Sequence, residues 1–199
     1  MKRILFFTAC VCGPLAALAA PATYTIDPTH TFPSFEADHM GISTWRGKMN
    51  GSSGTVSLDK TSGKGSVDVT IDLGSIDFGL DALNTWARGD GFFDVAKYPR
   101  ATYKGTLSGW LPDAATAWVD GELTLHGVTR PVILDIHSFK CVEHPVFKRD
   151  YCGADATASF KRDDFGLDAG KDYGFRMDVN LRIQVEALID ANAEAAPAH

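Results

Sequence analysis

The stretch FRMDVNLRIQVEA, residues 175–187, alternates apolar and polar side chains without a break. In an extended strand successive side chains point to opposite faces, so this segment has one apolar face and one polar face. The apolar positions are Phe175, Met177, Val179, Leu181, Ile183, Val185 and Ala187. Such a pattern is typical of an antiparallel sheet that covers a core with one face and meets water with the other.

The same period of two recurs through most of the chain. Residues 66–73 and 119–125 alternate in this way, and further segments of strand composition lie between turn signals such as Asn50-Gly51. These segments are residues 32–40, 45–50, 54–59, 101–107, 131–139 and 154–161. The sequence therefore predicts an all-β chain with eight or more antiparallel strands. Long alternating strands in succession favour a closed barrel over a sandwich, because closure removes the sheet edges.

One short segment has helical periodicity instead. The apolar side chains of residues 80–88 fall on one face of a helix, and Gly89 follows as a stop signal. The adjacent aromatic residues Phe92 and Phe93 come next. We expect this helix and the two phenylalanines to form a lid or an upper wall at the mouth of the barrel.

The first residues predict export. Lys2 and Arg3 precede an uncharged apolar run that ends in the small-residue pattern Ala17-Leu18-Ala19, so residues 1–19 are interpreted as a secretory signal peptide. The alternative is a lipoprotein anchored through Cys10, whose preceding residues are a poor acylation context. We expect a periplasmic protein that is released by cleavage after residue 19.

The remaining chain is predicted to be one barrel domain, residues 20–190, followed by a flexible tail, residues 191–199. The formal net charge of the whole chain is −6. An acidic chain argues against nucleic acid and against anionic membrane surfaces as partners. No segment after the signal is apolar over the roughly 20 residues of a membrane-spanning helix. Whether the chain forms a homodimer is left open.

Two of the four cysteines, Cys10 and Cys12, lie in the predicted signal peptide. Cys141 and Cys152 therefore remain as an even pair in an oxidising compartment, which predicts a disulfide that closes a short loop.

The function depends on whether the barrel is filled or hollow, since barrels of about eight strands can be either. Ala154, Ala156 and Ala158 share the predicted inward face of one strand, and Gly105 lies inward on another. Small inward residues leave room for a ligand, or they face bulky partners in an ordinary packed core. Periodicity alone leaves both interpretations open.

The sequence offers little for catalysis. His39 shares a face with Phe35 and Ala37, which predicts an inward histidine, and a hydrogen-bonded core histidine is favoured over a ligand contact. The sequence contains no nucleophile elbow, phosphate loop or zinc-protease motif, and the six histidines lack the spacing of a zinc site. We expect no catalytic residue and no metal ligand.

Six pieces of the sequence stand out by their order and spacing: YTIDPTH (residues 24–30), FEADHMGIS (35–43), Gly47, FFDVAKYP (92–99), GELTLHGVT (121–129) and RDDFG (162–166). Together they resemble the YceI-like family of bacterial periplasmic proteins. The resemblance spans nearly the whole predicted mature chain. It implies an eight-stranded antiparallel lipocalin-like barrel with a short helix at the mouth and an elongated apolar tunnel.

The resemblance also implies a function: the barrel binds, and carries or stores, an amphiphilic lipid such as a polyisoprenoid or an isoprenoid quinone. The ligand would be a non-covalent isoprenoid or fatty-acyl lipid, with no cofactor. We expect His30 and His39 to orient it. The wall would consist of Phe35, Trp45, Trp86, Phe92, Phe93 and Tyr103. Trp86-Ala87 stands where the family often has His-Leu, which predicts a more apolar mouth.

Two other functions stay open at this point. A filled barrel would favour a protein-interaction module that uses the loop between Cys141 and Cys152. An inward His39 beside a carboxylate would suit a small hydrolase or isomerase.

Overall fold

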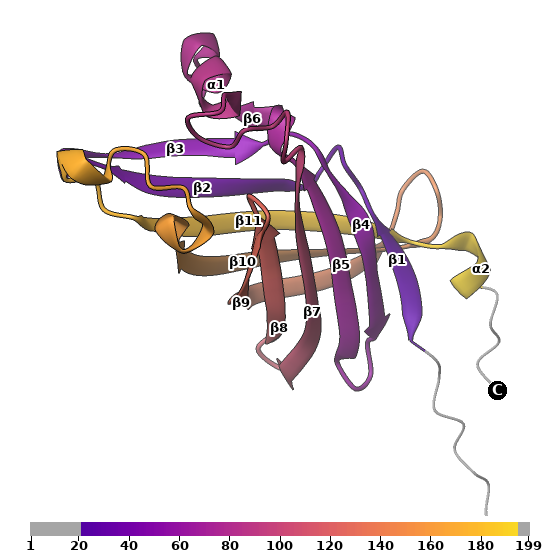
Figure 1. Ribbon diagram of the computed structural model, residues 1–199. Helices are drawn as coiled ribbons and strands as arrows, with labels where there is room; N and C mark the ends of the chain where they lie inside the picture. Colours follow the sequence, from indigo (N-terminus) through magenta and orange to yellow (C-terminus); the bar gives the residue numbers. More distant parts are fainter. Residues whose placement is uncertain (1–20, 195–199) are drawn as a thin grey trace, which may run out of the picture.

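The computed structural model describes residues 21–194, which form an antiparallel barrel that consists mostly of strands (Figure 1). The predicted signal peptide, residues 1–19, lies outside the described residues. The first part of the predicted tail forms the short helix α2 (Ala191–Glu194). None of the helices in residues 21–194 has the length and apolar character needed to cross a membrane.

The barrel is a closed ring of eight antiparallel strands, which confirms the predicted fold class. In the order of their pairing, the ring strands are β1 (Ala22–Ile26), β4 (Ser52–Asp59), β5 (Lys64–Asp72), β7 (Arg100–Leu111), β8 (Thr116–Leu125), β9 (Val128–Glu143), β10 (Asp150–Lys161) and β11 (Asp178–Ile189). The ring closes where β1 pairs with β11.

The sheet extends beyond the ring at one end, because β11 has two partners along the same edge. Its last residues pair with β1, and its first half pairs with β2 (Phe32–His39). Next to β2 lie β3 (Ser43–Met49) and the two-residue strand β6 (Ile76–Asp77). The helix α1 (Asp81–Arg88) packs beside β6 at the top of Figure 1.

The two ends of the barrel differ in the segments that they carry. The helix end carries α1, the turn between β2 and β3, and the connection between β10 and β11. The disulfide end carries the turn between β4 and β5 and the loop between β9 and β10.

The structure corrects two details of the predicted strands. β11 begins at Asp178, so Phe175 and Met177 precede it. The reason lies in Gly170 and Gly174, which flank the 3-10 turn η3 (Lys171–Tyr173) with φ of 83° and 84° and so turn the chain before an extended strand starts. The closing strand β1 has no counterpart among the predicted strands.

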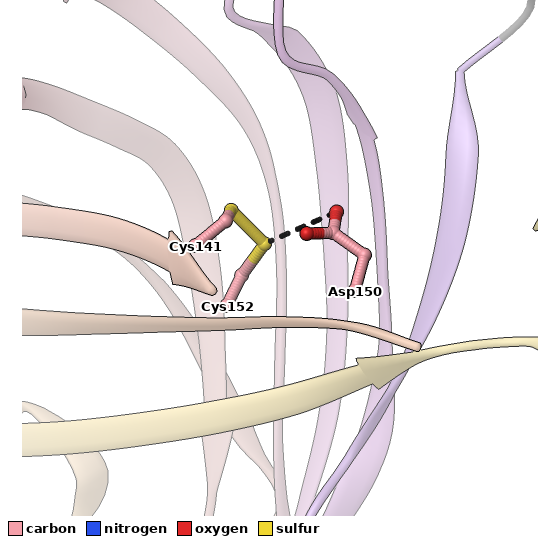
Figure 2. A group of neighbouring side chains, drawn as sticks. All are labelled: Cys141, Asp150 and Cys152. Carbon is pink, nitrogen blue, oxygen red and sulfur yellow. Dashed lines mark hydrogen bonds between the residues drawn. A yellow bond between two sulfur atoms is a disulfide. The ribbon is translucent and has the colours of Figure 1, made fainter. Parts of the chain in front are cut away.

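The predicted disulfide between Cys141 and Cys152 is confirmed. The two cysteines face each other in the register of β9 and β10, eleven positions apart in the chain. Figure 2 shows the disulfide beside the carboxylate of Asp150. The crosslink fixes the hairpin at the disulfide end of the barrel.

Replacing both cysteines, Cys141→Ser with Cys152→Ser, is expected to lower the free energy of unfolding by about 3 kcal/mol, because the open loop gains freedom in the unfolded chain. Urea unfolding followed by circular dichroism measures this loss. Wild-type protein reduced with a thiol should unfold at the same urea concentration as the double variant. An unchanged unfolding midpoint in both samples would show that the disulfide adds no constraint.

Candidate ligand-binding cavity

The barrel interior contains two adjacent chambers. The chamber at the disulfide end has a volume of about 200 Å³, and the chamber at the helix end has a volume of about 180 Å³. Both are lined by the same four apolar side chains where they meet: Pro33, Ile71, Leu123 and Leu181. We call these four residues the waist. The barrel is therefore hollow on both sides of a narrow middle.

The disulfide-end chamber is lined by aliphatic side chains from every strand of the ring, among them Val56, Val69, Leu134 and Ile183. This lining follows from the period of two, because alternate residues of each strand point into the barrel. A cavity with apolar walls suits a hydrocarbon chain.

Polar groups occur at the outer rim of this chamber. Asp150 accepts hydrogen bonds from the Tyr24 hydroxyl at 2.7 Å and from the Lys60 ammonium at 2.6 Å. Burial, together with the neighbouring Asp150, raises the pKa of Tyr24 well above its ordinary value. These contacts join β1, β10 and the turn after β4, and so hold the rim together.

The helix-end chamber has an aromatic wall. Trp86 of α1 stacks on Phe92 with ring centroids 5.0 Å apart, and Phe92 meets Phe93 at 4.7 Å. Phe35 of β2 and Trp45 of β3 also line this chamber. The helix and the loop after it thus cover the end of the chamber.

One buried cation belongs to this wall. Arg162, at the start of the 3-10 turn η2 (Arg162–Phe165), is 7% exposed and lines the helix-end chamber. Its guanidinium donates to the main-chain carbonyls of Leu167 at 2.6 Å and Ala169 at 2.7 Å.

The predicted wall residues lie around the cavity. Phe35, Trp45, Trp86, Phe92 and Phe93 line the helix-end chamber, and Tyr103 lines the disulfide-end chamber. Their contact with a ligand stays a prediction.

The two predicted histidines lie elsewhere. His30 is on the surface, where its Nδ1 is 2.8 Å from Asp27, and this hydrogen bond raises the pKa of His30. His39 stacks on Trp45 with centroids 4.1 Å apart and meets the edge of Phe175 at 5.0 Å. Neither histidine is part of a chamber wall. The turn after β1 carries His30 outward, and aromatic neighbours cover His39.

Small inward residues play both of the roles that the sequence left open. Ala154 and Ala156 line the disulfide-end chamber and leave room for it. The space at Gly121, in contrast, is filled from the neighbouring strand β7, because a Cβ there would lie 2.4 Å from the Tyr103 hydroxyl. A Cβ at Gly105 would likewise lie 2.6 Å from Val119. The Tyr103 hydroxyl points to the carbonyls of Val119 and Val132, at 3.1 and 2.8 Å.

Sequence reasoning missed Arg162 as a wall residue, although a signal was present. Ala154, Ala156, Ala158 and Phe160 occupy alternate inward positions of β10, and Arg162 is the next position in that series. The charge of Arg162 concealed the pattern, because charged residues are rarely buried.

Cys141, Asp150 and Cys152 lie close enough to hold a metal ion (Figure 2). Both sulfur atoms are joined in the disulfide, so neither is a thiolate ligand. A single carboxylate remains, which is a poor metal site.

Proteins of other bacteria are similar to this chain in sequence. A UPF0312 protein of Pseudomonas savastanoi pv. phaseolicola is 30% identical over 155 residues, which cover 76% of this chain and 80% of that protein. A UPF0312 protein of Vibrio parahaemolyticus is 33% identical over 141 residues, 68% of this chain and 73% of that one.

Two solved structures have the same fold at low sequence identity. BcnA of Burkholderia cenocepacia has a TM-score of 0.69 at 22% identity and covers 81% of this chain and 99% of its own. A polyisoprenoid binding domain from Saccharophagus degradans, implicated in plant cell wall breakdown, has a TM-score of 0.58 at 21% identity and covers 87% and 100% of the two chains.

The family model described as the YceI-like domain matches residues 24–187, from the strand that closes the ring almost to the end of its partner β11. The match includes every strand that lines the two chambers. The resemblance predicted from the sequence is therefore confirmed, and the chain belongs to the YceI-like family.

Proposed function

We propose that this protein binds an amphiphilic lipid, such as a polyisoprenoid or an isoprenoid quinone, inside the barrel and carries or stores it in the bacterial envelope. The observation that carries the proposal is the pair of adjacent apolar chambers on either side of the waist. The polyisoprenoid binding domain of Saccharophagus degradans, which has the same fold, supports it.

The energetics favour a long apolar tail. Burying hydrocarbon contributes about 25 cal/mol for each Å² of apolar surface removed from water, so a tail that occupies both chambers binds tightly with few polar contacts. The aliphatic wall at the disulfide end suits the distant part of such a tail. The helix-end chamber, which also has polar groups in its wall, suits the part nearer the head.

The geometry supports binding over the two alternatives. His39, on which an enzymatic role would depend, is packed between Trp45 and Phe175 and does not reach a chamber. A filled barrel, which a protein-interaction module would favour, disagrees with the two chambers. A non-enzymatic carrier accounts for the hollow interior.

The disulfide is consistent with an envelope or periplasmic protein, because disulfides persist in oxidising compartments. We propose the periplasm as the location, with residues 1–19 as the cleaved signal.

Mass spectrometry of protein purified gently from a bacterial envelope tests the proposal. An organic extract is expected to contain a lipid with a long apolar tail, and the protein itself is expected to start at Ala20 and to have no free thiol. An extract without lipid in repeated preparations would contradict the binding function. Retention of residues 1–19, or acylation at Cys10, would contradict the proposed export route.

Filling the disulfide-end chamber should shorten the tail that the barrel accepts. In the variant Ala156→Trp, the indole occupies space between the waist and the chamber wall. Loss of two or three buried methylene groups, at about 0.8 kcal/mol each, weakens binding of a long prenyl chain on the order of tenfold or more. Titration with long and short prenols, followed by intrinsic fluorescence, measures the difference.

The matched control is Ser159→Trp, on the outward face of the same strand. This variant should bind long and short prenols as the wild type does. Equal affinity of Ala156→Trp and wild type for the long prenol would show that the tail does not enter the disulfide-end chamber.

A further inference from the structure

A single buried guanidinium sits in the otherwise largely apolar helix-end chamber. Arg162 is 7% exposed, and its Cζ lies 5.8 Å from the centroid of the Phe92 ring. Both residues belong to the chamber wall. Burying a charge is costly unless a partner compensates for it, so the surroundings of Arg162 are informative.

The hydrogen-bond partners of Arg162 are neutral. Nη1 donates to the carbonyl of Leu167 and Nη2 donates to the carbonyl of Ala169. A guanidinium has five N–H donors, so these two bonds fix its plane and leave further donors for another acceptor. Within residues 21–194, Arg162 takes part in none of the ion pairs.

Neither carboxylate whose charge acts on Arg162 from its own segment forms an ion pair with it. Asp163 accepts from the Lys171 ammonium at 2.7 Å, and Asp168 is exposed to solvent. Burial lowers the pKa of Arg162, while the charges of Asp163 and Asp168 act in the opposite direction. Arginine stays protonated in proteins, so the positive charge persists in the wall.

Asp38 is the acidic residue in the same chamber wall, and it already has partners. Its carboxylate accepts from the Arg176 guanidinium at 2.9 Å and from the main-chain N–H groups of Gly41 and Arg176. These contacts hold the pKa of Asp38 below its ordinary value. The charge of Asp38 is thus balanced by Arg176 and not by Arg162.

We propose that Arg162 binds an anionic head group, a phosphate or a carboxylate, of the lipid whose tail extends past the waist into the disulfide-end chamber. This inference rests on the proposed function and specifies the charge of its ligand. The planar fork of a guanidinium matches two oxygens of either anion. The apolar wall strengthens the attraction, since it lowers the local dielectric constant.

A purely structural role for Arg162 makes a different prediction. If the guanidinium only holds the turn at Leu167 and Ala169, charged and neutral lipids with the same tail bind equally well. The comparison between such lipids therefore separates the two roles.

The first experiment compares geranylgeranyl phosphate, geranylgeranoic acid and geranylgeraniol on delipidated wild-type protein by calorimetry. At least one anion is expected to bind on the order of 10- to 100-fold more tightly than the alcohol, the range for a buried charge-assisted hydrogen bond. The anion that gains the affinity identifies the head as phosphate or carboxylate. Equal affinity of all three overturns the role of Arg162, while failure of all three to bind overturns the proposed function itself.

The second experiment removes the charge. Arg162→Met should abolish the preference for the anion and leave the affinity for geranylgeraniol unchanged, and Arg162→Lys should retain part of the preference. Arg46→Met, which removes an exposed arginine paired with Glu36, is the matched control and should keep the full preference. A preference that survives in Arg162→Met overturns the proposal.

Circular dichroism shows whether Arg162→Met folds. If it does not fold, a measurement on the wild type alone tests the contact. Phosphorus NMR follows the second ionisation of bound geranylgeranyl phosphate, which has a pKa of about 6 for a free phosphate monoester. A neighbouring guanidinium favours the dianion and should lower this pKa. An unchanged value in the bound state overturns the contact.

Discussion

The pairing of β1 with β11 is the contact on which the barrel depends. Three register pairs join the strands, from Tyr24 opposite Ile189 to Ile26 opposite Ala187. Without them the sheet would remain open between its first and last strands, and the disulfide-end chamber would lose one wall. Tyr24 and Ile26 also point into that chamber, so the residues that close the ring line the cavity as well.

The strands were predictable where alternation is long, and less so where it is short. Residues 175–187 indicated β11, and the aromatic pair after α1 indicated an upper wall. β1 is only five residues long, too short for a period of two to stand out. Its place is set by partners distant in the chain, which local sequence does not specify.

The cavity was harder to predict than the fold. A small inward residue leaves a space only where no neighbouring side chain fills it, and the sequence does not show which side chains are neighbours. Ala156 faces open space, whereas Gly121 receives the Tyr103 hydroxyl. The same alternation that placed Ala154 and Ala156 inward also placed Arg162 inward, but a charged residue is a weak candidate for a wall. The spacing of His30 and His39 did not reveal where their side chains lie. His30 sits on a surface turn beside Asp27, and His39 stacks on Trp45, so neither lines a chamber.

The closure of the ring also governs when this protein can fold. The two strands of the seam lie at opposite ends of the domain, so the contact that closes the ring joins residues far apart in the chain. Contacts between distant residues slow folding, because the entropy of closing a long loop opposes them. The barrel therefore completes only after β11 has been synthesised, and until then the apolar faces of the other strands stay exposed.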